Sequence, residues 1–268
     1  MRFIRLSTLK TQFPEYRFPF TGTEAETFRS VFYASNIASN QSIPETEQWL
    51  LSLQSEEFVL FLDWTEQERN LTAVLEGTDT IRPFQNSTRM TQHAMFERYR
   101  RFVTPFLQPR LNETLTACKP EIWQDALTYL TLLTERESEL TQQIVYDRMR
   151  KQHALAEQLI RKAKTEDELL HIVRSNLKPD FIAALNLLTS VFYQAKTAWI
   201  QLLRLVAEHP AGTRRLVLYM SKELQQLHLN PDHLKELQEL DKSVKSGEVK
   251  VESSTWPLKQ IIYLSLGL

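Results

Sequence analysis

The chain has 268 residues, of which 42% are hydrophobic, and its 32 Lys and Arg almost balance its 33 Asp and Glu. This length and composition allow a sizeable hydrophobic core, and the balanced charge excludes a strong overall field that would attract nucleic acid or anionic lipid. The single cysteine, Cys118, excludes an intrachain disulfide and a cysteine-based zinc site, and it suits a reducing compartment.

Glycine is scarce, and no two glycines are close enough to form a Walker loop, a dinucleotide fingerprint or a Gly-x-Ser-x-Gly elbow. The signatures of most nucleotide-dependent and hydrolase folds are therefore missing. We predict a protein that is not an enzyme and needs no cofactor or metal. The first ten residues contain no apolar run like that of a secretory signal, so we expect a cytoplasmic location.

Residues 1–20 combine aromatic side chains with Pro14 and Pro19, which exclude a helix interior at their positions. We predict an extended N-terminal arm that lies over its own helical body, and docking of a partner by this arm is the alternative.

The apolar run from Phe58 to Leu62 fits a buried strand or a buried helix, and we predict a helix because a lone strand would have no partner. Three other helices are expected nearby, in residues 23–40, 44–53 and 65–77.

A further helix is expected from residue 87 to residue 103, and its end is the most basic part of the chain. Arg98, Arg100 and Arg101 alternate there with aromatic residues, a mixture that can hold phosphates and stack bases or bind an acidic protein surface. At helical spacing, however, the aromatic residues fall on one side and form a core stripe beneath solvated arginines. We favour the core stripe and keep binding of nucleic acid by the three arginines as the alternative.

Prolines interrupt the stretch that follows, so residues 104–119 are predicted to be a broken connector between two domains. Residues 121–164 contain neither glycine nor proline and fit a single long helix, but the apolar stripe shifts by one position after Ile144. This shift indicates either a change of packing partner or a break into two helices near residues 134–143. That polar segment is expected to face solvent or a partner.

The stretch from Pro179 to His209 is apolar nearly all the way round and is predicted to be one buried helix of about thirty residues, which other helices must cover. Its uncharged part is too short for a membrane span.

Just before this stretch, Glu168 and His171 form a single Glu-x-x-His unit, which di-iron carboxylate bundles use twice. A metal-dependent helical-bundle enzyme is therefore only the third hypothesis.

The C-terminal part begins with a polar linker at residue 242 and continues into an apolar tail, which must dock on its own chain or on another molecule. Large side chains of this tail would bury enough apolar surface to hold a partner, either in a groove or as a strand added to a sheet edge. The candidate partner-binding residues are Trp256, Ile261, Ile262, Leu264 and Leu266.

These elements predict a mainly α protein, either a multi-helix bundle or an irregular α-solenoid, with an extended N-terminal arm and a short apolar C-terminal tail. We expect an N-terminal helical part in residues 1–103, the connector in 104–119, a long-helix bundle in 120–241, and the linker with the tail in 242–268. By elimination, the predicted function is that of a scaffold or adaptor subunit that binds other proteins, or further copies of itself, in a larger assembly.

Overall fold

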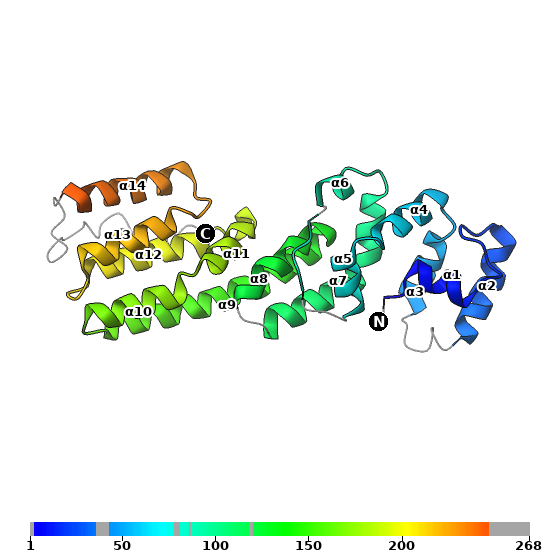
Figure 1. Cartoon of the computed structure of the whole chain (residues 1–268), viewed down its shortest axis with the longest axis horizontal. Coiled ribbons are helices and arrows are strands. Elements are labelled where there is room, and N and C mark those ends of the chain that lie inside the picture. Colours follow the sequence, from blue (N-terminus) through cyan, green and yellow to red (C-terminus); the bar gives the residue numbers. More distant parts are fainter. Residues whose placement is uncertain (1–2, 36–42, 78–80, 86, 118–119, 247–268) are drawn as a thin grey trace, which may run out of the picture. The chain divides into compact units, whose positions relative to one another are not determined.

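The protein is mainly α-helical, as predicted. The computed structural model describes residues 3–35, 43–77, 81–85, 87–117 and 120–246, which form fourteen α-helices and two short 3-10 helices with no strand among them (Figure 1). Within these ranges, no helix combines the length and the apolar character that a membrane crossing needs.

The chain divides into two compact units, Met1–Val145 (unit 1) and Tyr146–Leu268 (unit 2). Unit 1 contains α1 (Leu6–Gln12), α2 (Gly22–Ala34), α3 (Ile43–Ser52), α4 (Glu56–Thr65), α5 (Arg69–Glu76), α6 (Ser87–Thr91), α7 (Phe96–Ala117), α8 (Pro120–Leu127), the 3-10 helix η2 (Thr128–Leu132) and the first part of α9 (Glu135–Lys162). Unit 2 contains the rest of α9, α10 (Glu166–Asn176), α11 (Pro179–Leu187), the 3-10 helix η3 (Ser190–Phe192), α12 (Gln194–Glu208), α13 (Arg214–Leu224) and α14 (Pro231–Ser246).

The predicted extended N-terminal arm is wrong in part, because residues 6–12 form helix α1. The two prolines follow this helix, and Leu6 and Leu9 are fully buried where α1 packs on α4. The Glu66 carboxylate accepts the backbone N–H groups of Leu6 and Ser7, and so caps the free donors at the start of α1. The expectation that the arm covers its own chain is confirmed by the burial of Phe3, Phe13 and Phe20.

The predicted connector at residues 104–119 is also wrong, because α7 continues through it to Ala117 with Pro105 and Pro109 inside the helix. A proline in a helix interior removes one hydrogen bond and crowds the preceding turn. Here tertiary packing outweighs that cost, since buried side chains recur at helical spacing on both sides of the prolines. They are Phe96, Tyr99, Phe102, Val103, Leu107, Leu111 and Leu115, and they include the predicted aromatic core stripe.

The stretch predicted as one long helix or two contains a break at residues 133–134, between η2 and α9. The polar segment after the break does not simply face solvent. Thr141 and Gln142 are buried, and the Thr141 hydroxyl donates to Asn112 Oδ1 at 3.0 Å. The Gln108 amide of α7 also hydrogen-bonds Glu137. A polar seam therefore joins α7 to the start of α9 within unit 1.

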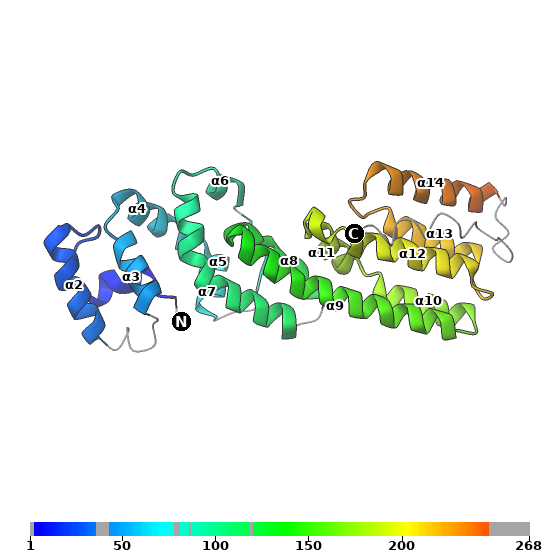
Figure 2. The same cartoon turned by 180° about the vertical axis from the view of Figure 1, so that it is seen from behind.

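The predicted thirty-residue helix at Pro179–His209 consists instead of α11, η3 and α12, with extended backbone at Leu188 and Thr189. Asn186 stabilises this break, because its side-chain amide donates to the Gln226 carbonyl at 2.9 Å and accepts the His228 N–H at 2.7 Å. The side chain of Val191 is 68% exposed, so the stretch is not covered all round. After the break, α12, α13 and α14 lie side by side (Figures 1 and 2).

Candidate functional site

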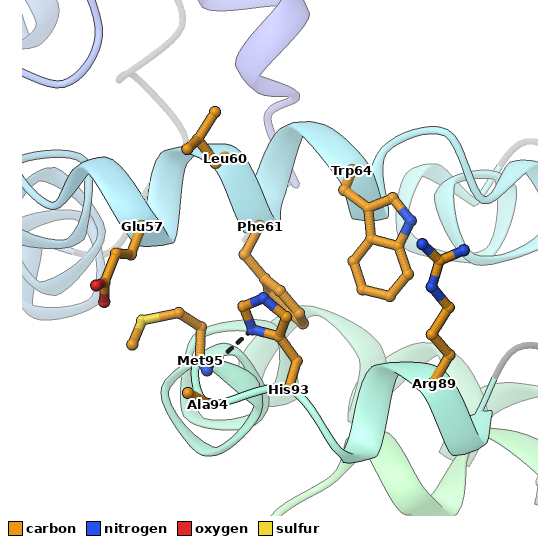
Figure 3. A pocket seen from close by; sticks show the side chains of 8 residues that line it. All are labelled: Glu57, Leu60, Phe61, Trp64, Arg89, His93, Ala94 and Met95. Atoms are coloured by element: carbon orange, nitrogen blue, oxygen red, sulfur yellow. Dashed lines mark hydrogen bonds between the residues drawn. The ribbon is translucent and has the colours of Figure 1, made fainter.

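An open cleft of about 480 Å³ lies in unit 1 between α4 and the chain that runs from α6 into α7 (Figure 3). Helix α4 forms one wall. Its N-terminus is capped by the Ser55 hydroxyl, which accepts the Phe58 N–H at 3.4 Å. The α4 residues that line the cleft are Glu57, Leu60, Phe61 and Trp64.

The spacing of these four residues, i, i+3, i+4 and i+7, places them along one side of α4. Phe61 is buried, whereas the side chain of Leu60 is 63% exposed. Leu60, Phe61 and Trp64 adjoin one another along the cleft, and contiguous apolar surface of this kind can mark a site that binds another molecule. The cleft therefore offers an apolar ridge on α4 that nothing in the described part of unit 1 covers fully.

His93, from the opposite side of the cleft, lies against the aromatic residues of α4. Its ring centroid is 4.4 Å from that of Phe61 and 6.3 Å from that of Trp64. Its Nδ1 accepts the backbone N–H of Met95 at 3.1 Å, so the neutral ring carries its hydrogen on Nε2 (Figure 3). This bond holds the imidazole in place as a part of the cleft floor.

Arg89 of α6 provides a positive charge at the Trp64 end of the cleft. Its Cζ lies 5.4 Å from the centre of the Trp64 ring. A cation over an aromatic face is stabilised by about 0.5–1 kcal/mol at an exposed site. Among the residues that the structure describes, no carboxylate forms an ion pair with Arg89. The ring of Trp64 thus positions the guanidinium at this end of the cleft.

The three arginines of the predicted basic patch have different environments. The guanidinium of Arg100 is bound within the protein, since its Nε donates to the Leu133 carbonyl at 2.9 Å and its Nη1 donates to the Glu97 carboxylate at 2.8 Å. Arg98 and Arg101 are exposed. Arg98 lies over the Phe58 ring, with its Cζ 5.1 Å from the ring centre. Arg98 and Arg101 are one turn apart on α7, and only these two present an open cationic surface.

The other candidate residues from the sequence give no second site. The tail residues Trp256, Ile261, Ile262, Leu264 and Leu266 lie outside the described residues. Glu168 uses its carboxylate to accept the Lys164 N–H at 2.6 Å at the start of α10. Over the described ranges, no group of three or more His, Cys, Asp or Glu side chains is placed to hold a metal ion.

A polar cluster in unit 2 was not anticipated from the sequence. The buried Lys196 ammonium donates to the His228 carbonyl at 3.2 Å, and burial lowers the pKa of this lysine. The Tyr193 hydroxyl accepts the Asn230 N–H at 2.9 Å and is hydrogen-bonded to His233 Nδ1 at the same distance. These bonds fix the turn between α13 and α14 against α12, and we assign the cluster a structural role.

Sequence reasoning also missed the cleft, although one signal for it was present. In the apolar run from Phe58 to Leu62, helical spacing places Leu60 on the side opposite to Phe58 and Leu62. A run that is apolar on both sides of a helix predicts a second contact surface. Arg89, His93 and Met95 carry no motif, and only the turn between α6 and α7 brings them to this ridge.

Comparison of the chain with models of known protein families, with curated proteins and with solved structures found no match.

Proposed function

We propose that the protein is a non-enzymatic adaptor that binds other proteins, and that the cleft beside α4 is one of its docking sites. The observation that carries this proposal is the combination of the exposed Leu60 with an aromatic floor and a positioned Arg89. Aromatic residues, methionine and arginine are enriched at the energetic centres of protein interfaces. Helix α4 and the α6–α7 turn bring these residue types together in one opening.

A second apolar surface in unit 2 supports the same proposal. Leu155 and Leu159 follow one another by one turn on α9, and their side chains are 57% and 42% exposed. Pairs at this spacing are the usual anchors when two helices associate. An adaptor needs at least two surfaces for other molecules, and each unit supplies one.

We further propose that the tail from Trp256 to Leu268 is an attachment element, as its apolar sequence suggests.

Binding of nucleic acid remains the second candidate, because Arg98 and Arg101 are exposed next to each other on α7. Two cations can neutralise only two phosphates, which gives weak binding, and the formal net charge of −1 for the whole chain adds no attraction to nucleic acid. If this surface binds phosphates, affinity for a labelled oligonucleotide must fall with added salt and fall again in the Arg98→Ala/Arg101→Ala variant. Absence of binding at low salt removes this candidate.

The adaptor function is tested by affinity purification of the full chain from native lysate with quantitative mass spectrometry. We compare the wild type with Leu60→Asp, and use Leu51→Asp as the matched control, since Leu51 is an exposed leucine of α3 that does not line the cleft. We expect a set of proteins that is lost with Leu60→Asp and kept with Leu51→Asp. Identical sets for all three proteins contradict a docking role for the cleft.

A further inference from the structure

The two charged side chains of the cleft, Glu57 and Arg89, lie at opposite ends of α4. Glu57 lies at one end of the lining and Arg89 at the other, with the apolar ridge between them (Figure 3). Glu57 and Trp64 are seven residues apart on α4, which corresponds to about 10.5 Å along the helix axis. A ligand that lies along this wall therefore meets a negative charge, an apolar stretch of two helical turns and a positive charge, in that order.

The α4 wall itself indicates that this ligand is a helix. Its lining residues form a ridge at i, i+3, i+4 and i+7, the same pattern by which an amphipathic helix binds in a groove. The ligand side chains that match this wall are also two turns apart, with a carboxylate facing Arg89 and a cation facing Glu57. Large apolar residues between these charges would contact Leu60, Phe61 and Met95.

The helix dipole decides the orientation of such a ligand. An acidic residue stabilises the N-terminal turn of a helix, and a basic residue stabilises its C-terminal turn. A helix with its acid at Arg89 and its base at Glu57 therefore has its N-terminus near the C-terminal end of α4. This is the antiparallel arrangement, in which the dipoles of the two helices also attract each other.

Resting on the adaptor function proposed above, we infer that the cleft binds an amphipathic helix of a partner protein antiparallel to α4. The bound helix has Asp or Glu in its first turn, large apolar residues three and four positions later, and Lys or Arg at the seventh position after the acid. Arg89 suits this acid, because its planar guanidinium binds a carboxylate through two hydrogen bonds and is already held on Trp64.

The test uses fluorescein-labelled peptides of about 20 residues, long enough to form a helix, with the pattern Glu-x-x-Φ-Φ-x-x-Lys at their centre, where Φ is Leu, Phe or Trp and the remaining positions are Ala and Gln. A second set has Lys and Glu exchanged. Fluorescence anisotropy with the full chain measures both sets at low salt. We expect the first set to bind two- to fivefold more tightly, the range that exposed ion pairs provide. The Glu57→Lys/Arg89→Glu variant should prefer the exchanged set by a similar factor.

Two controls connect the binding to the cleft. Leu60→Asp should abolish binding of both sets, and Leu51→Asp should leave it unchanged; circular dichroism confirms that each variant is folded. The inference is overturned if no peptide of either set binds, if both sets bind equally, or if the preference does not reverse in the charge-exchanged variant. Loss of native partners with Leu60→Asp would still support the adaptor function in these cases, so the two proposals fail separately.

Discussion

The Glu66 carboxylate accepts the backbone N–H of Ser7 at 3.1 Å, across 59 positions of the sequence. This bond, with the one to Leu6, fixes the first turn of α1 against the end of α4. Arg5 provides a second connection through its ion pair with Glu76 at the end of α5. The N-terminal segment is thus part of the folded body of unit 1. Through Glu66 it also helps to fix the position of α4, the helix that carries the exposed ridge.

The first prediction concerns the pH dependence of this cap. Burial raises the pKa of Glu66 above its ordinary value of 4.5, against the lowering effect of the two N–H bonds. The folded state therefore binds the Glu66 proton more tightly than the unfolded state, and this contribution to stability is lost as the pH rises through the raised pKa. The free energy of unfolding of the wild type, relative to Glu66→Gln, should be larger at pH 4 than at pH 7.

Urea unfolding at the two pH values measures this difference. Glu15→Gln, at an exposed position next to Pro14, is the control for the removal of one carboxylate. A difference between wild type and Glu66→Gln that is the same at both pH values, or larger at pH 7, contradicts the proposed role of burial.

The second prediction separates the arginines of α7. Arg100→Ala removes the bond to the Leu133 carbonyl, the ion pair with Glu97 and the contact over Phe96. Because a hydrogen bond to a charged group contributes about 1.5–3 kcal/mol, we expect a loss of roughly that size in the free energy of unfolding. Arg101→Ala should change it by less than about 0.5 kcal/mol. Equal losses in urea unfolding would show that Arg100 does not tie α7 to the start of α9.

The local features of the fold were predictable wherever side-chain periodicity alone determines the structure. The aromatic core stripe of α7 is an example, since it follows from the spacing of apolar residues. The helix at residues 56–64 was predicted for a different reason, because a lone strand there would have had no partner. The N-cap of α10 agrees with a different local signal, because the Thr165 hydroxyl accepts the Glu168 N–H within a Thr-x-x-Glu sequence.

The errors occurred where tertiary contacts outweigh local preference. Pro105 and Pro109 signal a break, yet buried neighbours keep α7 continuous. The stretch after Pro179 contains no strong break signal, yet α11 ends at Leu187, where Asn186 in its last turn bonds to residues 226 and 228. The cleft depends on the meeting of α4 with the α6–α7 turn, which no local pattern specifies.

The third prediction concerns the proposed attachment tail, residues 256–268, which lie outside the described residues. The polar linker was expected to begin at residue 242, but residues 242–246 are the end of α14, and Val244 is buried there. In the sequence, residues 247–255 still separate the tail from this helix, so the tail and the helical body need not share one core. Deletion of these residues should leave the melting temperature unchanged and remove a partner or an oligomer, as measured by differential scanning fluorimetry and by size-exclusion chromatography with light scattering. A much lower melting temperature, or precipitation, would make the tail part of the core.

The central claim, that the cleft beside α4 docks another protein, is tested most directly by site-specific photo-crosslinking in cells. Benzoylphenylalanine is placed at Leu60 and, as the matched control, at Leu51, which is 52% exposed on α3. Our account predicts discrete crosslinked products of defined mass from position 60 that are absent from position 51 and whose yield falls when Arg89→Glu is added. No product from position 60, or the same products from both positions, would contradict it.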